Sequence, residues 1–572
     1  MSLRSVRHWR TILFESHSLA LLSGIGILTG VATALVISGF MLCIDLVIHL
    51  LQGQAESGFH DFSPIIRFTL PFAGAALLIL VYKLSNKRYQ DVGIAHVIDR
   101  LQRGRGKVPV PNAVFQFVSA VITLASGFSM GKEGPAVHVG SSIASKLGQQ
   151  LYRSPSQLRL LTGCGTAAAI SAAFGTPLAG VLFAMEIVLM EYSLNGFIPI
   201  IAASVTASVM TKFILGESAA LLQTEVSIGG LIDMPWVILT GIVTGLVAAG
   251  LHKTIKSFLM MNLVRVEVRF LLAAMITGLL GYFRPEVMGL GYDTMNQVLA
   301  GQFSLGLLIT LLLAKMLATG AAVGLGIPAG IVAPSLVIGL TTGAIIGVLA
   351  PGDANNAYYA LIGMAGLMSA LLHAPLAALT AILELSLNAQ MMFPAMMVVV
   401  LANLTCQVLF SQPSVFRTLL SVRGLNITTH PMRNALASRF LTEIATFQFC
   451  VLTDQMDEAM IAHVIETDRR LVVFRYQSNN YLMTMNMVQK QFERWHSLEN
   501  KSDVELIHYI AKAIPERSRI ALLEQDVSLL EGIRILQNDN VVAIQVPVDK
   551  FRIGLVTRAK LTSVLTTEGE LQ

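Results

Sequence analysis

The stretch Gly131-Lys132-Glu133-Gly134-Pro135 decides how the rest of this chain is interpreted. It separates an apolar run over 114–130 from a second one that continues towards Leu147. The pattern predicts a glycine-hinged turn that opens a helix inside a membrane-like segment. An ionisable side chain at such a place is costly and marks a functional site by default. Because free N–H groups and the helix dipole bind anions there, Glu133 is predicted to fill an anion site or to give way to a diffusible anion.

A second stretch repeats this pattern in the other half of the chain. Residues 131–140 and 330–339 share the outer Gly, the Pro and the final Gly. A second block follows in both copies, with six residues from Ser to Pro and nine from Pro to Glu: Ser171, Pro177 and Glu186, then Ser369, Pro375 and Glu384. Two homologous halves with a substrate site between broken helices are typical of repeat transporters.

The composition is that of a polytopic membrane protein. Of 572 residues, 54% are hydrophobic and 13% are charged, a balance that is wrong for a soluble enzyme. The net charge is +5 and no basic patch alternates with aromatic residues, so no nucleic-acid partner is expected. The four cysteines have neither metal nor redox spacing. We therefore expect no metal site, and no enzymatic nucleophile with its base is found among the apolar segments.

Apolar runs predict fourteen membrane segments, several of them too short to cross a bilayer of about 30 Å at 1.5 Å per residue. Short segments with Gly/Pro breaks should converge inside the molecule as half-helices. The basic residues Arg4, Arg7, His8 and Arg10, and a basic cluster over 87–107, predict a cytoplasmic location for both stretches. The predicted segments are 18–52, 64–84, 112–130, 134–150, 157–173, 177–194, 197–215, 234–251, 268–283, 303–323, 328–349, 357–373, 375–388 and 392–411.

The composition changes after about residue 412, where charges become frequent and the long apolar runs stop. The tail contains the order strand, helix, strand, strand twice, in 449–484 and 519–558. The resulting division is a membrane domain over 1–425, a linker over 426–445 and a soluble tandem repeat over 446–572.

Together these motifs resemble the CLC family of chloride channels and proton-coupled chloride transporters. The resemblance rests on 131–135, on Gly330-Ile331-Val332-Ala333-Pro334 and on 177–183 ahead of Glu186, and it covers roughly residues 15 to 425. The tail resembles a pair of CBS modules. The implied fold is an all-α polytopic membrane protein with two inverted repeats and broken half-helices, followed by an α/β CBS pair. The implied assembly is a homodimer in a lipid bilayer, with chloride and other small anions as transported ligands and no cofactor.

The resemblance also assigns roles to individual residues. Glu133 takes the place of the gating carboxylate, which mimics an anion and swings away on protonation. The amides of Ile331 and Val332 are expected to cradle the central anion, and Lys132 to supply positive potential or, equally, to be a snorkelling surface lysine. The residues expected along the anion path are Val92, Gly93, Ile94, Lys132, Gly134, Ile331, Val332 and Phe416.

Two of these positions depart from the family pattern. Val92 stands where the family has a serine, and Phe416 where it has a tyrosine. Both side-chain donors to the central anion are therefore lost, and chloride would bind through backbone amides. The anion preference stays open.

A third departure concerns protons. Family exchangers carry two consecutive acids where this chain has Glu186 followed by Ile187, which is similar to the family's channels. A gated chloride channel is therefore favoured. The first alternative is a proton-coupled exchanger in which Glu186 or Glu191 carries protons, and the second is a non-conducting sensor that signals through the CBS pair.

Several charged residues have structural alternatives. For Glu186 and Glu384 the preferred prediction is pairing at helix ends, and proton transfer is the alternative. For His138 the preferred prediction is a buried, hydrogen-bonded histidine, and a pH sensor is the alternative. Lys315 either pairs with an acid or shapes the field of the pore.

The ligand of the tail and the location of the chain are also predicted. Neither copy of the tail has the Asp that usually holds the ribose of a nucleotide: the strings are 554–560 and 481–487. Docking and assembly are therefore the preferred functions of the tail, and adenine-nucleotide binding is the less favoured alternative. The expected location is a bacterial inner membrane with both termini in the cytoplasm.

Overall fold

The computed structural model describes residues 19–52, 58–103, 106–151, 155–192, 194–216, 229–261, 263–351, 355–425, 436, 439–477, 479–498, 505–515, 518–523, 527–538, 540–547 and 552–569. The chain divides into two compact units, Met1–Ile427 and Thr428–Gln572. The basic N-terminal residues Arg4, Arg7, His8 and Arg10 lie outside the described residues, as does most of the predicted linker.

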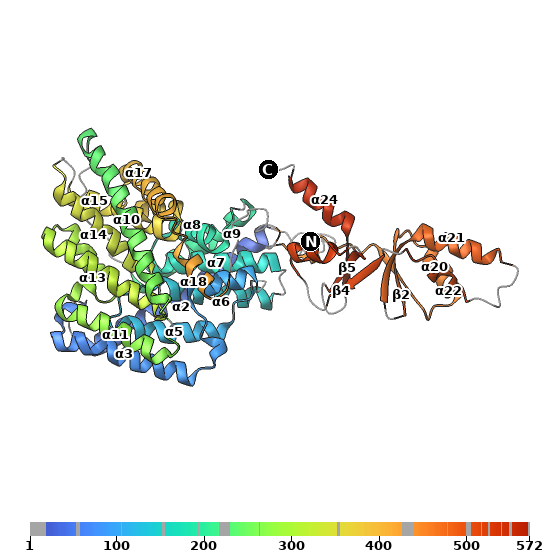
Figure 1. Cartoon of the computed structure of the whole chain (residues 1–572), viewed down its shortest axis with the longest axis horizontal. Helices are drawn as coiled ribbons and strands as arrows, with labels where there is room; N and C mark the ends of the chain where they lie inside the picture. Colours follow the sequence, from blue (N-terminus) through green and yellow to red (C-terminus); the bar gives the residue numbers. More distant parts are fainter. Residues whose placement is uncertain are drawn as a thin grey trace, which may run out of the picture. The chain divides into compact units, whose positions relative to one another are not determined.

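The first unit is built from helices, many of them apolar (Figure 1). Its first half contains α2 (Leu19–Gln52), α3 (Pro64–Leu84), α4 (Gly93–Gln102), α5 (Val110–Ala125), α6 (Glu133–Gln150), α7 (Pro155–Phe174), α8 (Pro177–Phe183), the π-helix η3 (Ala184–Leu189) and α9 (Leu194–Leu215). Its second half contains α10 (Met234–Leu259), α11 (Val266–Phe283), α12 (Tyr292–Leu299), α13 (Leu305–Gly324), α14 (Val332–Leu349), α15 (Asn356–Leu372), α16 (Pro375–Ser386), α17 (Met392–Asn403), the π-helix η7 (Leu404–Leu409) and α18 (Val415–Val422).

Most predicted segments correspond to helices, and the differences have local causes. The segment 112–130 ends as a helix at Ala125, because Gly127 takes a positive φ of 77° and the chain then runs to the turn at Gly131 without helical hydrogen bonding. The segment 177–194 consists of α8 and a short π-helix. Helices α4, α12 and α18 were not predicted, because each has only eight to ten residues and polar side chains on one face.

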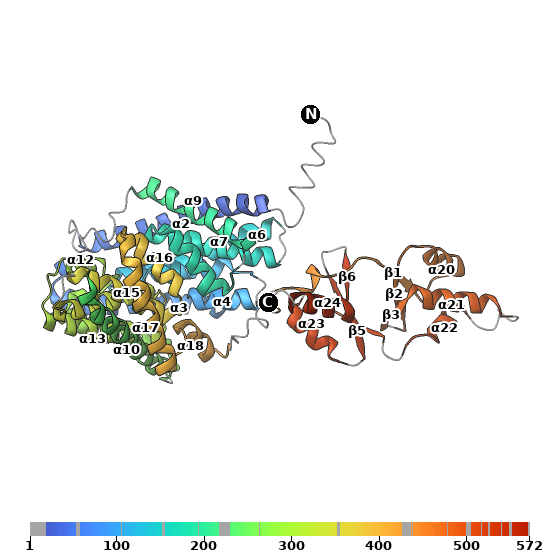
Figure 2. The same cartoon turned by 90° about the horizontal axis from the view of Figure 1, so that it is seen from above.

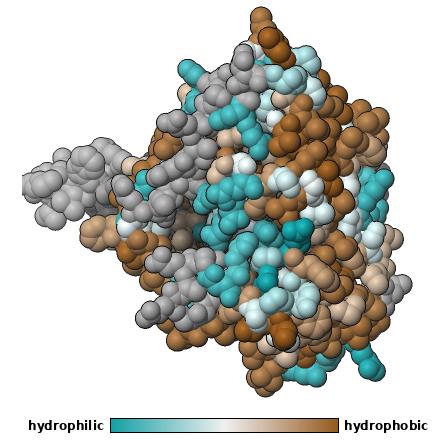
Figure 3. Space-filling view, turned by 90° about the vertical axis from the view of Figure 1, so that its left-hand side faces the viewer, coloured by the Kyte–Doolittle hydropathy of each residue, from teal (hydrophilic) through white to brown (hydrophobic). Residues whose placement is uncertain are grey.

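The apolar helices are suited to a lipid environment. In the described part of the chain, eight helices are long and apolar enough to cross a membrane. Leu28, Leu35 and Leu46 on α2 and Leu313 on α13 are each more than half exposed, as expected of side chains that face lipid. Figure 3 shows one face of the molecule, on which broad hydrophobic areas adjoin a hydrophilic strip.

The two halves repeat the same packing. Helix α6 packs on α7 (Figure 2), and α14 packs on α15 (Figure 1). A Cβ on Gly140 would overlap the carbonyl oxygen of Gly165, and one on Gly339 would press on that of Gly363. Each helix pair therefore crosses closely at two glycines, at matching positions of the two repeats.

The second unit contains a six-stranded sheet in the order β1-β2-β3-β4-β5-β6. In each copy the first two strands are parallel and the third is antiparallel to the second. The copies join where Tyr481 of β3 pairs with Arg519 of β4. The predicted order strand, helix, strand, strand is confirmed in both copies and is consistent with a CBS pair. The elements are β1 (Phe449–Thr453), α20 (Glu458–Ile465), β2 (Leu471–Tyr476), β3 (Asn479–Thr484), α21 (Met485–His496), α22 (Leu506–Ala511), β4 (Arg519–Leu522), α23 (Leu529–Leu536), β5 (Val541–Pro547), β6 (Ile553–Thr557) and α24 (Arg558–Gly569).

Candidate functional site

The two glycine turns predicted from the repeat meet each other in the fold. The amide of Gly131 donates to the carbonyl of Gly330 at 2.8 Å, and the amide of Gly330 donates back at 2.7 Å. Helix α6 begins two residues after Gly131, and α14 begins two residues after Gly330. A Cβ on Gly134 would come within 2.9 Å of the Gly330 Cα. Glycine is required at this crossing because the two backbones touch.

The carboxylate of Glu133 lies between these helix starts. Glu133 is the first residue of α6 and is completely buried. Its Oε1 accepts a hydrogen bond from the amide of Val332, the first residue of α14, and the amide of Ala333 also faces the carboxylate. The carboxylate therefore occupies the position at a helix N-terminus where an anion is stabilised by free N–H groups and the helix dipole.

Glycines form the walls around this carboxylate. A methyl group on Gly131 would overlap both carboxylate oxygens of Glu133, and one on Gly330 would overlap Oε1. Oε2 of Glu133 has no hydrogen-bond partner among the described residues. The carboxylate is thus held mainly through Oε1 in a cradle of backbone and amide groups.

Lys132 is buried beside Glu133. Its Nζ lies 5.5 Å from the ring centroid of Phe174 and 5.1 Å from that of Tyr292, and only 8% of the residue is exposed. The acids that act on it are Asp45 and Glu133. A buried cation over two aromatic rings gives a positive potential at this point, and it contradicts the alternative of a snorkelling surface lysine.

Lys315 is held by backbone carbonyls. It is fully buried on α13, and its Nζ donates to the carbonyl of Val287 at 2.8 Å and to that of Gly289 at 3.4 Å. An acid partner was one of the two alternatives that the sequence left open for this lysine. The carbonyls at the end of the short helix η5 (Pro285–Val287) take that place, where a helix C-terminus favours a cation.

The stretch at 92–94 forms the start of α4. Gly93 has a φ of +83°, which favours glycine, and Ile94 is buried. Val92 is the N-cap of the helix and makes no side-chain capping bond, so the donor lost with the family's serine is not replaced locally.

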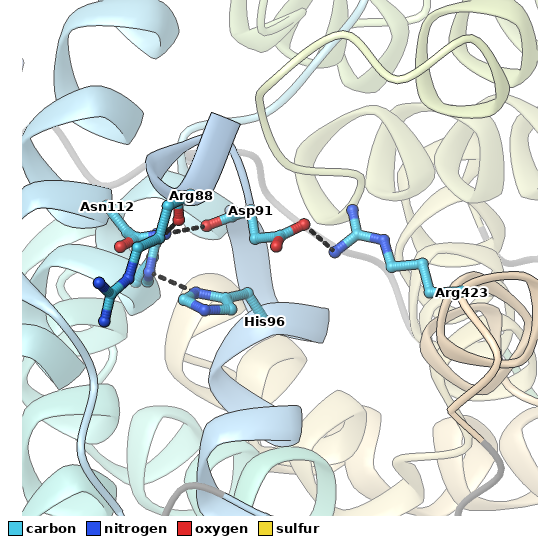
Figure 4. A network of polar contacts seen from close by, with 6 residues as sticks. Arg88, Asp91, His96, Asn112 and Arg423 are labelled. Carbon is cyan, nitrogen blue, oxygen red and sulfur yellow. Dashed lines mark hydrogen bonds and ion pairs between the residues drawn. The ribbon is translucent and has the colours of Figure 1, made fainter. Parts of the chain in front are cut away.

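Two side chains anchor the turn before α4 (Figure 4). Asn112 donates to the carbonyl of Asp91 at 3.0 Å and to that of Arg88 at 3.2 Å. The carboxylate of Asp91 lies 3.8 Å from Arg423, just after α18. Asp91 therefore links the turn to α18.

Phe416 is buried at the start of α18, which packs against α4. The side chains of Val92 and Phe416 have no N–H or O–H group, so neither can donate a hydrogen bond to an anion. The structure thus brings Glu133, Lys132, Gly134 and Val332 together, and it places Val92 and Phe416 on neighbouring helix starts.

An apolar cavity adjoins the start of α14. It lies between the repeats and is lined from both of them, with Val332 among its walls. Its larger lining residues are Ile170, Phe174 and Phe183 from the first repeat and Leu336, Met368 and Leu385 from the second. This cavity places open space beside the residue whose amide holds the carboxylate of Glu133.

Glu186 and Glu384 cap each other's repeat. Each carboxylate accepts two backbone amides at the start of the corresponding half-helix in the other half. Oε1 and Oε2 of Glu186 accept from Leu376 at 3.1 Å and Ala377 at 2.8 Å, and those of Glu384 accept from Leu178 and Ala179, both at 2.8 Å. This reciprocal capping is the internal pairing that was the alternative to a proton role.

One neighbour of Glu186 carries a hydroxyl, since Tyr192 donates to Oε1 of Glu186 at 2.9 Å, whereas Ile187 and Glu191 supply little to a proton path. Ile187 is buried and apolar. Glu191 lies 3.6 Å from Arg159, which donates to the carbonyls of Leu189 at 2.7 Å and Leu101 at 3.3 Å. Glu191 is therefore part of an ion pair at the end of η3.

His138 is a buried, hydrogen-bonded histidine, and its partner is a second histidine. Its Nε2 lies 3.0 Å from Nδ1 of His96 on α4. His96 is not among the residues predicted for the site. The available signal was a histidine one helical turn after Val92, on a face of α4 that is otherwise apolar.

The fold and the site define a polytopic membrane protein of two repeats with an anion cradle where their broken helices meet. A family model described as "voltage gated chloride channel" matches residues 73–407. The chain therefore belongs to this family, the CLC family, as the motifs predicted.

Relatives and solved structures agree with this assignment. A ClcB-like chloride channel protein of Ralstonia nicotianae is 28% identical over 61% of this chain and 84% of that protein. The H⁺/Cl⁻ exchange transporter ClcA of Salmonella paratyphi B is 28% identical over 52% of this chain and 66% of its own length. A slow cyanobacterial Cl⁻/H⁺ antiporter has a similar fold, with a TM-score of 0.63 and 22% identity over 71% of this chain and 98% of that one.

The likeness in fold extends over the tail. A eukaryotic CLC transporter aligns with 95% of this chain and 98% of its own, with a TM-score of 0.62 and 17% identity. The predicted fold class, a CLC membrane domain followed by an α/β region, is confirmed. Membership of a family of transporters and channels is also consistent with the expectation that the chain is not an enzyme.

Proposed function

We propose that this chain moves small anions, with chloride first, across a membrane along a path gated by Glu133. The observation that carries the proposal is the buried carboxylate of Glu133 at the start of α14, bound to the amide of Val332. A group placed there mimics a bound anion, because the same amides and helix dipole stabilise either one.

The gate follows from this competition for one site. When the carboxylate is charged it occupies the anion position and closes the path. When it is protonated or displaced, its interaction with the amides weakens and a diffusible anion replaces it. Lys132 adds positive potential beside this position, and the cavity next to Val332 continues the path.

The names of the relatives favour proton exchange over the channel that the sequence favoured. ClcA of Salmonella is named an H⁺/Cl⁻ exchange transporter, and two of the solved structures with this fold are described as proton antiporters. The apolar Ile187 and the capping role of Glu186 remain in favour of a channel. We propose exchange against protons as the mode, with the channel as the alternative.

The remaining assignments are also proposals. The anion path is formed by Val92, Gly93, Ile94, Lys132, Gly134, Ile331, Val332 and Phe416 of the domain 1–425. The domain 446–572 is a cytoplasmic CBS pair that serves docking and assembly. The protein works as a homodimer in a bacterial inner membrane with both termini in the cytoplasm.

The test is chloride efflux from liposomes that contain the purified protein, with external pH recorded. Wild type should release chloride, and Glu133→Gln should change the rate. Glu267→Gln, at an exposed glutamate of α11 that pairs with Lys83, is the matched control and should behave as wild type. Absence of chloride, nitrate and fluoride flux from wild type and Glu133→Gln alike would overturn the proposal and favour a non-conducting sensor.

A further inference from the structure

Two buried histidines form a hydrogen-bonded pair close to the gate. Nδ1 of His96 and Nε2 of His138 are 3.0 Å apart, and the rings are nearly perpendicular, at 89°. His138 is completely buried and His96 is 7% exposed. Nδ1 of His138 has no hydrogen-bond partner among the described residues. In a buried site an unsatisfied ring nitrogen is costly, so it calls for a functional explanation.

The pair lies between the gate and an exposed acid. His138 follows Glu133 by five residues on α6, about 7.5 Å along the helix axis. His96 is on α4, directly after the turn that carries Asp91 (Figure 4), whose side chain is 65% exposed. The exposed carboxylate, the two rings and the gate thus follow one another through the first repeat.

The charged groups around the pair are few. Asp91, Arg100 and Arg423 act on His96, and His96 itself is the titratable group that acts on His138. Arg423 is already paired with Asp91. The described neighbours therefore include no acid that would fix a permanent positive charge on His138.

Proton exchange requires a protonatable group that the family position does not supply. Ile187 has no titratable atom, Glu186 accepts two amides of α16 and the hydroxyl of Tyr192, and Glu191 is paired with Arg159. Imidazole can take a proton on one nitrogen while it releases another from the second nitrogen. A hydrogen-bonded histidine pair is therefore suited to the missing step.

We propose that His96 and His138 relay protons between Glu133 and the side on which Asp91 is exposed; this inference rests on the proposed exchange of chloride against protons. In one direction, a proton that leaves Glu133 crosses the gap of about 7.5 Å along the axis of α6 and then binds Nδ1 of His138. The proton on Nε2 of His138 then moves to Nδ1 of His96, and the proton on Nε2 of His96 leaves towards Asp91 and solvent. One proton enters and one leaves, and the reverse sequence or a tautomer exchange resets both rings.

The experiment measures proton and chloride movement together in liposomes with a chloride gradient. His138→Gln and His96→Asn keep a polar atom near the position of the bonded nitrogen but cannot pass a proton through a ring. We expect proton flux to fall at least about tenfold, while chloride flux stays close to wild type. His252→Gln is the matched control, since His252 is equally buried and its Nε2 bonds to Thr418 at 3.0 Å; it should keep both fluxes.

Three results would overturn the relay. Unchanged proton flux in both variants would leave exchange intact and assign it to another group. Equal loss of both fluxes in His138→Gln and His96→Asn would make the pair a structural link between α4 and α6. If wild type moves chloride without any protons, both the proposed exchange and the proposed relay are wrong. The proposed anion path would still stand.

Discussion

At the scale of the residue, the proposed gating depends on how little space surrounds the carboxylate of Glu133. The three atoms nearest to a methyl group on Gly131 would all belong to that carboxylate, and the methyl group would overlap them. We therefore predict that Gly131→Ala displaces the carboxylate, weakens its competition with chloride and raises chloride efflux by about two- to tenfold. The measurement is chloride release from liposomes.

The control for this substitution is Gly306→Ala. Gly306 lies in the first turn of α13 and has open space where a Cβ would lie, so efflux should match wild type. An efflux rate of Gly131→Ala equal to or below that of wild type, in protein with a normal melting temperature, would contradict the close fit of the gate.

At the scale of the element, each half-helix start is completed by a carboxylate from the other repeat. Glu384 accepts the amides of Leu178 and Ala179 at the start of α8. Glu384→Ala should leave these buried or half-buried donors unsatisfied and cost about 1–3 kcal/mol. We expect a lower melting temperature in detergent, with a smaller loss for Glu384→Gln, which retains one acceptor oxygen.

Glu267→Ala is the control for that measurement. It removes an exposed ion pair with Lys83 at 3.3 Å, and such pairs contribute about 0–1 kcal/mol. If Glu384→Ala melts no earlier than Glu267→Ala, the reciprocal capping is not a stabilising feature of the fold.

Some features of the elements could be predicted from the sequence, and contacts between distant elements could not. The start of α6 was predicted to within one residue, because Gly131 and Pro135 form a local pattern that Gly330 and Pro334 repeat. The segment predicted from residue 328 begins as a helix only at Val332, after the turn at Gly330. Three contacts could not be predicted from the sequence. They are the hydrogen bond between His96 and His138, the bonds of Lys315 to backbone carbonyls, and the reciprocal capping by Glu186 and Glu384. Each joins groups that are distant in the chain, and such a contact leaves no local pattern in either segment.

Corrections at this scale came from burial and from short helices. The sequence was equally compatible with an exposed Lys132 and a buried one. The structure shows that its Nζ lies over the rings of Phe174 and Tyr292. Helix α4 was missed because its ten residues are too few for a membrane segment. It nevertheless carries Gly93 and His96, and its start is where the family resemblance placed part of the anion path.

At the scale of the whole molecule, the tail should not act as a nucleotide sensor. The guanidinium of Arg558 follows β6 and donates to the carbonyls of Asn538 and Val541, both at 3.2 Å, in the stretch where nucleotide-binding modules carry an Asp. We predict that ATP, ADP and AMP leave the melting temperature unchanged. A ligand at a hundred times its Kd would add about 2.7 kcal/mol to the stability of the tail, so a clear upward shift would contradict this prediction.

The most direct test of the gate is the dependence of chloride flux on external pH in wild type and in Glu133→Gln. Protonation neutralises the carboxylate and frees the anion position, so wild-type flux should rise as the pH falls. Glu133→Gln is neutral at every pH, and its flux should be the same throughout the range. If wild type and Glu133→Gln have the same pH dependence, another group sets the gate and the central claim is wrong.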